Sequence, residues 1–188
     1  MTITRNVAVL IGSLRKGSFN RKLAEALIKL SPQRLRCEVV EIGQLPLYNQ
    51  DLEDGGDTPV AWAAFRRKLG EFDAVLFVTP EYNRSVPGGL KNALDVASRP
   101  SGKSVWDAKP AAVVSATPGA MGGFGANHHL RQSLVFLNMP TLQQPEAYIG
   151  RAASLFADDG GIANEGTREF LRGFMNAFAA WIETTVKH

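Results

Sequence analysis

Residues 7–20 of the chain are VAVLIGSLRKGSFN. The first five are apolar, and an unbroken apolar run is typical of a strand that is buried on both faces of a parallel sheet. Gly12 to Gly17 form a predicted loop, and Ser18 is the expected N-cap of a helix that continues to Leu30. This stretch therefore predicts a strand, a loop and a helix in that order, which is the repeating unit of an α/β fold.

The same alternation of strand and helix continues along the chain. Further strands are predicted at Leu35–Ile42, Ala74–Thr79, Ala111–Ser115 and within residues 140–149. Further helices are predicted at residues 59–70, 87–98, 127–137 and 167–186, with residues 43–58 as a loop. The expected fold is a flavodoxin-like three-layer α/β/α sandwich with a five-stranded parallel sheet of strand order 2-1-3-4-5. Residues 1–188 contain no linker or repeat, so we expect a single domain.

The composition limits the classes of partner and location. Of the 188 residues, 45% are hydrophobic and 21% are charged, as in an ordinary globular protein. The net charge of +3 is not concentrated in a run of lysine or arginine, so a nucleic-acid partner is not expected. Cys37 is the only cysteine, and no apolar run is long enough to span a membrane. We therefore expect a cytoplasmic protein with no membrane partner, and a core position without a catalytic role for Cys37.

Aromatic and histidine residues outside the loops have simple structural interpretations. The last helix carries aromatic residues at helical spacing, which predicts that they face the core: Phe170, Phe174, Phe178 and Trp181. Trp62 and Phe65 are likewise expected to pack inside. His128 and His129 are adjacent and lack the spacing of metal ligands, so we predict surface positions for them and no metal site.

The strand order predicts where a ligand binds. The chain order reverses between the first and third strands, which leaves a crevice at their carboxyl ends. The loops that begin at Gly12 and Pro80 are therefore expected to meet, and the loop after Ala116 is expected to flank them. The loop at residues 47–51 is a weaker candidate for the border of the same site.

The first of these loops has the character of an anion site. It joins a strand to a helix N-terminus, where backbone N–H groups are free to bind an anion. Ser13, Ser18 and Asn20 add side-chain donors, and Arg15 offers a charged fork for phosphate oxygens. The loop lacks both the Walker A pattern and the pattern Gly-x-Gly-x-x-Gly. This disfavours an NTPase and a Rossmann enzyme that binds a dinucleotide at its first loop. The alternative is a tight turn with a capping serine.

The other two loops suit a flat ring. Residues 80–89 are PEYNRSVPGG, in which prolines supply rigidity and Tyr82 supplies apolar surface with a polar tip. Asn83 and backbone N–H groups can address ring oxygens and nitrogens. Residues 115–123, SATPGAMGG, are small enough for the backbone to approach a ring closely. The alternative for residues 80–89 is a turn that restarts a helix at Pro87.

These motifs resemble a known family. Residues 12–20 are similar to the phosphate loop of the NAD(P)H-dependent FMN reductases, and residues 80–83 with 85–95 are similar to that family's flavin loop. The likeness is strongest to the bacterial quinone reductases that are also described as chromate reductases, and it continues through residues 129–132 and 145–146. The resemblance implies an FMN cofactor, NADPH or NADH as electron donor, a small-molecule acceptor, and a homodimer or homotetramer with the flavin site near the subunit interface.

The resemblance also implies the residues of the cofactor site. The phosphate loop comprises Ser13, Leu14, Arg15, Lys16, Gly17, Ser18, Phe19 and Asn20. The residues around the isoalloxazine ring are Pro80, Glu81, Tyr82, Asn83, Arg84, Ser115, Thr117 and Gly119. Hydride is expected to pass directly to flavin N5, so no side chain is predicted to act as an acid or base, and the protein supplies orientation and electrostatics.

The chain departs from the family pattern at three places. Arg84 stands where tyrosine is usual, Val96 stands where tryptophan is frequent, and residues 124–128 lack the typical arginine and tyrosine. These differences bear on acceptor preference and on tetramer contacts. We hypothesise that Arg84 adds positive potential at the mouth of the site, where it would attract the NADPH phosphate or an anionic acceptor.

Three other functions share the predicted fold. A one-electron flavodoxin carrier is usually acidic, whereas this chain is basic. A reductase that releases free reduced FMN would bind the flavin loosely, and a non-enzymatic nucleotide-binding module would not turn over NAD(P)H. Quinones, azo dyes, nitro compounds, chromate and ferric chelates all remain candidate acceptors.

Overall fold

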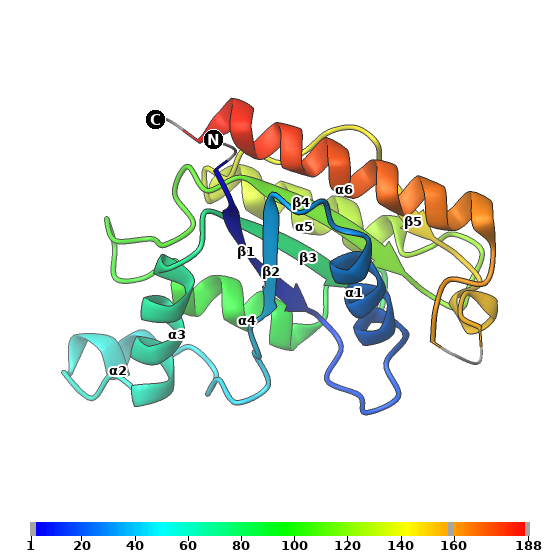
Figure 1. Ribbon diagram of the computed structural model, residues 1–188. Helices are drawn as coiled ribbons and strands as arrows, with labels where there is room; N and C mark the ends of the chain where they lie inside the picture. Colours follow the sequence, from blue (N-terminus) through cyan, green and yellow to red (C-terminus); the bar gives the residue numbers. More distant parts are fainter. Residues whose placement is uncertain (1–2, 158–159, 187–188) are drawn as a thin grey trace.

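A computed structural model describes residues 3–157 and 160–186. Its strands form one sheet of order β2-β1-β3-β4-β5, and each neighbouring pair is parallel (Figure 1). The strands are β1 (Arg5–Ile11), β2 (Leu35–Val39), β3 (Ala74–Thr79), β4 (Ala111–Ala116) and β5 (Ala147–Ile149). This arrangement confirms the predicted flavodoxin-like sheet.

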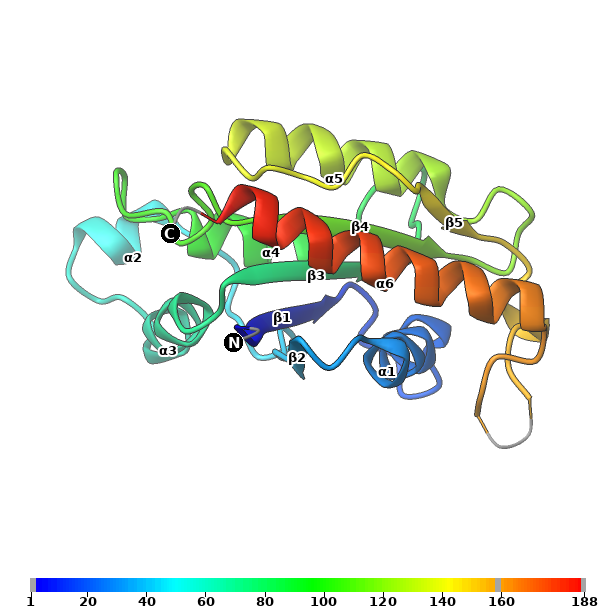
Figure 2. The same cartoon turned by 45° about the horizontal axis from the view of Figure 1, so that its top comes forward.

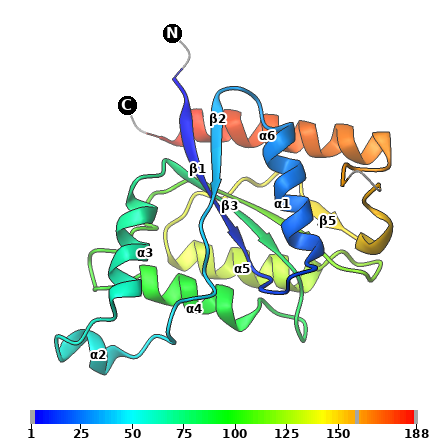
Figure 3. The same ribbon diagram turned by 60° about the horizontal axis from the view of Figure 1, so that its bottom comes forward.

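Helices cover both faces of the sheet (Figures 2 and 3). They are α1 (Phe19–Leu30), α2 (Gln50–Asp54), α3 (Val60–Gly70), α4 (Gly88–Ala97), α5 (Phe124–Phe136) and α6 (Glu165–Thr185), with a short 3-10 helix at Ala152–Ser154. One core lies between the sheet and helices α1 and α6, and the other lies between the sheet and helices α3, α4 and α5. Among the described residues, no helix combines the length and apolar character needed to cross a membrane.

Burial on both faces explains the unbroken apolar runs. Val7 and Val9 of β1 contribute to the core beneath α1 and α6, whereas Ala8 and Leu10 contribute to the opposite core. Every residue of β3 and β4 is buried. Because successive side chains of a strand point to opposite faces, each position on these strands must be apolar or hydrogen-bonded.

Several element boundaries differ from the predictions. β2 ends at Val39 rather than Ile42. Val40 keeps one hydrogen bond to the Val9 carbonyl at 3.0 Å, and Val40 and Ile42 then pack into the core with α3 and α4. Residues 43–58 were expected to form a loop but contain α2, whose N-cap Asn49 accepts a hydrogen bond from the Asp51 N–H at 3.0 Å. This local side-chain cap starts a short helix in a stretch without apolar periodicity.

The last two long helices begin earlier than predicted. α5 begins at Phe124 rather than Asn127, after Gly123 adopts a φ of +80° that favours glycine. α6 begins at Glu165 rather than Thr167, because the Asn164 side chain accepts a hydrogen bond from the Thr167 N–H at 2.9 Å. The start of α6 is therefore set by a polar cap and that of α5 by a glycine, and apolar periodicity detects neither.

The expected core aromatics are mostly inside. Phe174 and Phe178 are fully buried, and the half-buried Trp181 donates its ring N–H to the Pro140 carbonyl at 2.8 Å. Phe170 is 36% exposed, so the prediction of a core position was wrong there. Trp62 and Phe65 are buried as expected.

Cys37 is half-buried at the edge of the core beneath α1. Its Sγ lies 3.5 Å from the hydroxyl of Ser31. Burial raises the pKa of the Cys37 thiol, and the hydrogen bond from Ser31 only partly offsets that effect. The thiol is therefore less reactive than a free one.

Candidate functional site

The three loops singled out in the sequence come together at the carboxyl edge of the sheet. A Cβ atom added at Gly12 would lie 2.9 Å from Oγ1 of Thr79 and 3.2 Å from Cδ of Pro80, so the first and second loops are in contact. The Asn20 side chain at the start of α1 donates to the Ala116 carbonyl at 3.0 Å, which joins the first and third loops. The crevice predicted from the strand order is therefore bordered by all three loops.

The first loop combines buried hydroxyls with exposed cations. Ser13 and Ser18 are buried, and Oγ of Ser18 caps α1 by accepting the Arg21 N–H at 3.3 Å. Arg15 and Lys16 are exposed, and neither forms an ion pair with any residue that the structure describes. A helix N-terminus with unpaired cations beside it favours an anion.

Asn20 carries a buried acceptor without a partner. Its Nδ2 is bound to the Ala116 carbonyl, but its Oδ1 is buried and forms no hydrogen bond. An unsatisfied buried acceptor costs about 1–3 kcal/mol, and a hydroxyl of a bound molecule would remove that penalty. The position therefore points to a ligand that carries a hydrogen-bond donor near the start of α1.

The second loop ends in a tight hairpin. Tyr82 and Ser85 exchange two backbone hydrogen bonds of 3.0 Å. Asn83 and Arg84 have φ values of +51° and +65°, which are the two positive values of a type I′ turn. Tyr82 is 45% exposed, so the hairpin presents an aromatic ring at the edge of the sheet. We refer to residues 82–85 as the edge hairpin.

Arg84 reaches from the edge hairpin to the third loop. Its Nη1 lies 3.5 Å from Oε1 of Glu81 and 3.5 Å from Sδ of Met121. The Arg84 side chain is 74% exposed, whereas that of Glu81 is only 13% exposed. The positive charge is therefore presented to solvent, and the negative charge is held beneath it.

Gly122 and Gly123, both with positive φ, shape the third loop. Gly122 has a φ of +61°, and a Cβ there would lie 2.5 Å from the carbonyl carbon of Tyr148. Thr117 and Gly119 lie at the edge as predicted, with Thr117 half-buried and Gly119 exposed. Ser115 is fully buried, and its hydroxyl accepts a hydrogen bond from Asn127 at 3.3 Å. The Ser115 side chain is thus directed beneath α5 rather than toward solvent.

Arg131 ties α5 to the strand side of the site. Its Nε donates to Oδ1 of Asn127 at 2.9 Å, and its Nη1 donates to the Leu142 carbonyl at 2.8 Å. Burial lowers the pKa of the Arg131 guanidinium, and Tyr148 and Glu146 partly counteract this effect. These bonds hold α5 in place behind the third loop.

An aromatic cluster lies beside the third loop. The ring centroids of Phe124 and His128 are 4.3 Å apart, and those of Phe124 and Tyr148 are 5.3 Å apart. The exposed His128 places its Nε2 2.9 Å from the Tyr148 hydroxyl. Burial, followed by a hydrogen bond with Glu146, raises the pKa of Tyr148 to about 12. Tyr148 is therefore a neutral hydroxyl at physiological pH.

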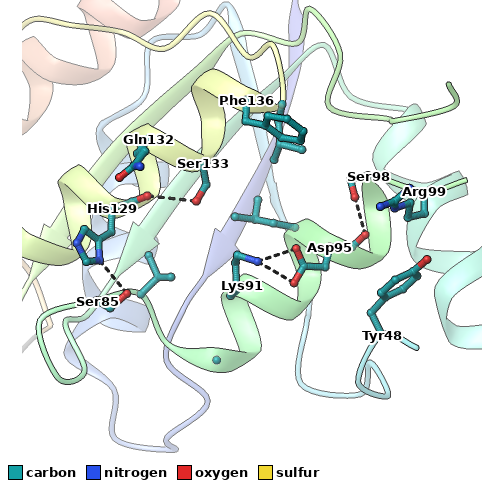
Figure 4. A pocket seen from close by; sticks show the side chains of 14 residues that line it. Tyr48, Ser85, Lys91, Asp95, Ser98, Arg99, His129, Gln132, Ser133 and Phe136 are labelled. Atoms are coloured by element: carbon teal, nitrogen blue, oxygen red, sulfur yellow. Dashed lines mark hydrogen bonds and ion pairs between the residues drawn. The ribbon is translucent and has the colours of Figure 1, made fainter. Parts of the chain in front are cut away.

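A groove between α4 and α5 was not found from the sequence. It has a volume of about 800 Å³ and begins at Ser85 of the edge hairpin (Figure 4). Lys91 and Asp95 form an ion pair of 2.8 Å on its α4 side, and Phe136 stands on its α5 side. Tyr48, from the weaker candidate loop, contributes to the wall. The sequence offered only an adjacent apolar pair, Val135 and Phe136, near the end of a predicted helix. The structure leaves these two residues 78% and 90% exposed.

The family model for NADPH-dependent FMN reductase matches residues 5–154. The chain belongs to the NADPH-dependent FMN reductase family. A quinone reductase of Pseudomonas putida is 61% identical to this chain over 97% of each protein. A 2-hydroxy-1,4-benzoquinone reductase of a Burkholderia species is 47% identical over 94% of this chain and 95% of its own. These findings confirm the family that the loop motifs predicted.

A solved structure agrees in both fold and class. The flavoenzyme NAD(P)H:(acceptor) oxidoreductase FerB of Paracoccus denitrificans superposes on the chain with a TM-score of 0.91. The two sequences are 44% identical, and the superposition covers 97% of this chain and 99% of FerB. Membership of the family makes this protein a flavoprotein oxidoreductase that uses FMN and NAD(P)H.

The contact between the first two loops yields a stability prediction. Gly12→Ala adds a methyl group within 2.9 Å of Thr79 Oγ1 and 3.3 Å of Leu90 Cδ2, where the neighbours must shift. We expect the free energy of unfolding to fall by roughly 1–3 kcal/mol, measured by urea denaturation. Gly17→Ala is the matched control, because nothing lies within 4 Å of its added Cβ. Equal stability of the two variants would contradict the close approach of the loops.

Proposed function

We propose that this protein is a cytoplasmic FMN-dependent NAD(P)H:quinone oxidoreductase. The overall reaction takes a hydride from NAD(P)H and a proton from water and reduces a quinone to its hydroquinone. The observation that carries this proposal is the carboxyl edge, where a helix start suited to an anion, with an unpaired buried acceptor, lies beside the edge hairpin. Relatives of 61% and 47% identity named for quinone reduction support the choice of acceptor.

The first loop suits the phosphate and ribityl parts of FMN. We assign phosphate binding to the hydroxyls of Ser13 and Ser18, the N–H groups at the start of α1 and the guanidinium of Arg15. The unpaired Oδ1 of Asn20 is free to accept a hydrogen bond from a ribityl hydroxyl. The donor set and the unsatisfied acceptor thus match a molecule that is anionic at one end and hydroxylated in the middle.

The second and third loops suit the isoalloxazine ring. We assign the ring to the space bordered by the edge hairpin, with Tyr82 as apolar surface and backbone groups of Asn83, Thr117 and Gly119 at its edge. When bound, FMN supplies the redox centre that accepts hydride from NAD(P)H and reduces the acceptor. The protein's own contribution is to bind and orient the reactants, because no side chain at this edge has to move a proton in the hydride step.

The breadth of the acceptor range belongs to the same proposal. Tyr82 and Arg84 are exposed, which leaves the ring space open to small acceptors of different shapes. Chromate, azo dyes, nitro compounds and ferric chelates are therefore included as secondary acceptors for an activity screen. Quinones are the first choice because two of the relatives are named for them.

Visible spectroscopy tests the proposed function directly. The purified protein is loaded with FMN, NADPH is added without oxygen, and then a benzoquinone is added. We expect the flavin bands to bleach with NADPH and to return with the quinone. Bands that do not bleach would favour an electron carrier, and rapid dissociation of the reduced flavin would favour a supplier of free reduced FMN. Failure to bind FMN would contradict the site itself.

Arg15 is expected to contribute to FMN affinity. Arg15→Ala removes a charge-assisted contact with the phosphate, which should cost roughly 1.5–3 kcal/mol of binding free energy. Quenching of FMN fluorescence on titration with apoprotein measures the dissociation constant. Arg36→Ala, at an exposed position of β2 that pairs with Asn6 far from the loops, controls for the loss of one positive charge. An Arg15→Ala protein with wild-type affinity would exclude the assigned role.

Arg84 is expected to affect NADPH rather than FMN. Arg84→Asn removes the charge while keeping a residue that tolerates the φ of +65°, and Arg84→Lys keeps the charge. We expect the KM for NADPH to rise about 3- to 10-fold in the asparagine variant only, with a weaker dependence on salt, because the exposed cation attracts the anionic donor. Steady-state kinetics from 20 to 300 mM salt would reject the hypothesis if both variants behaved like wild type.

The α4/α5 groove is proposed as the dimer interface. Val135 and Phe136 form an exposed apolar pair beside the groove, and such surfaces often mark protein interfaces. A second copy that covers the groove would lie next to Ser85, which places the ring space near the interface as the family resemblance implies.

Sedimentation velocity tests this interface. Phe136→Ser is expected to shift the protein from a dimer or tetramer toward the monomer at micromolar concentration, because an exposed apolar anchor is removed. Val60→Ser is the matched control, since Val60 is 85% exposed on α3, away from the groove. A monomeric wild type would contradict the proposed oligomer, and an unchanged Phe136→Ser variant would place the interface elsewhere.

A further inference from the structure

Helix α5 begins without a capping side chain of its own. Its N-cap residue is Gly123, which has no side chain to accept the N–H groups of the first turn. The missing acceptor comes from the second loop, 45 residues away, where Oε2 of Glu81 accepts the Ala126 N–H at 3.0 Å. A carboxylate at this position also interacts favourably with the positive end of the helix dipole.

Gly125 makes this contact possible. A Cβ atom at Gly125 would lie 2.9 Å from Oε2 of Glu81 and 3.0 Å from the carbonyl oxygen of Arg84. Both the Glu81 carboxylate and the backbone of the edge hairpin therefore rest directly on the first turn of α5. The close approach depends on glycine at 125, because any other side chain there would meet the carboxylate and the hairpin backbone.

A second bond joins the edge hairpin to the same helix. Nδ1 of His129, about one turn further along α5, lies 3.0 Å from the Ser85 hydroxyl, as the close view shows (Figure 4). The hairpin is thus held on both sides, by Glu81 before Tyr82 and by Ser85 at its end. The hydroxyl and the imidazole can exchange donor and acceptor roles, so this second bond does not depend on one tautomer.

We infer that Glu81 is a positioning residue of the ring site. This inference rests on the proposed function and gives Glu81 a role other than direct contact with the ring. Its carboxylate points toward α5, is 13% exposed and lies 3.5 Å from Arg84, so it holds the edge hairpin at a fixed place above the crevice. The exposed parts of Tyr82 and Arg84 then present a preorganised wall to the ring and the donor.

The role predicts a graded response to substitution. Glu81→Ala removes the acceptor and should raise the dissociation constant for FMN about 10- to 50-fold. Glu81→Gln keeps the length of the side chain and an oxygen for the Ala126 N–H, so it should recover most of the affinity. If Glu81→Gln recovers the FMN affinity, then the loss of affinity in Glu81→Ala is caused by the lost side-chain position and hydrogen bond, and not by the lost negative charge.

Asn164→Ala is the matched control for the loss of a helix cap. Asn164 caps α6 through a hydrogen bond from the Thr167 N–H of 2.9 Å, and it lies outside the three loops. Both alanine variants should lower the melting temperature of the apoprotein by a similar amount, because each loses one cap. Only Glu81→Ala should weaken FMN binding.

Hydrogen exchange in the apoprotein gives a readout that does not need the cofactor. The Tyr82 and Ser85 amides are hydrogen-bonded to each other's carbonyls across the edge hairpin. We expect these amides to exchange at least 10-fold faster in Glu81→Ala, and to stay near the wild-type rate in Glu81→Gln and Asn164→Ala. Gly125→Ala, which displaces the carboxylate while leaving Glu81 in place, should act in the same direction as Glu81→Ala.

The outcomes separate this inference from the proposed function. Wild-type FMN affinity and unchanged hairpin exchange in Glu81→Ala, with a lowered melting temperature, would reduce Glu81 to a helix cap and overturn the inference. A glutamine variant as defective as the alanine variant would overturn it in favour of a charge effect. A wild-type protein that fails to bind FMN would instead contradict the proposed function, while the exchange experiment would still decide whether Glu81 positions the hairpin.

Discussion

The parallel pairing of β1 with β3 is the constraint on which the rest of the structure depends. These neighbours are in register from Val7 opposite Ala74 to Ile11 opposite Val78. The connection after β1 leads to α1 on one face of the sheet, and the connection after β3 leads to α4 on the other face. The chain therefore diverges at the carboxyl ends of adjacent strands, and the uncovered backbone groups between the two loops form the crevice.

The crevice is shaped by backbone more than by catalytic side chains. Gly12 allows the first two loops to touch, and the two positive φ values of Asn83 and Arg84 fold the second loop into a hairpin. Exposed cations lie on the rim, whereas the carboxylate of Glu81 is turned inward onto α5. Such an arrangement suits a flavoprotein, in which the cofactor carries the difficult chemistry and the protein fixes geometry and potential.

The family relationship and the single contacts of the edge hairpin concern different levels of the structure. The whole fold is shared with relatives. The chain is 61% identical to a quinone reductase over nearly its full length, and it superposes on a flavoenzyme with a TM-score of 0.91. Arg84 and Gly125 concern single contacts, because Arg84 presents an exposed cation on the edge hairpin and Gly125 admits Glu81 to the first turn of α5. Differences between relatives in acceptor or donor preference are expected to arise from contacts of this second kind.

Local sequence patterns were sufficient for the fold and for the meeting of the three loops at one edge of the sheet. All five predicted strands are present, and the unbroken apolar runs became β1, β3 and β4, because a strand buried on both faces has no position for an unpaired polar group. The edge strand β2, in contrast, has exposed polar residues and an alternating pattern. Ser18 was expected to cap α1 and does so, and the strand order correctly brought the Gly12, Pro80 and Ala116 loops to one edge. The loop motifs identified the family because they are long and contiguous. The individual roles of the predicted site residues stay predictions.

Only the tertiary structure decided the contacts between segments that lie far apart in the chain. The start of α5 at Phe124, the acceptor that Glu81 offers to Ala126 and the groove beside Phe136 leave no periodic signal in the sequence. Periodicity reports only whether a residue is buried and on which face of its own element. Which side chain satisfies a free helix N–H, and which surface stays uncovered, depends on how the packed elements meet, and no single segment encodes that.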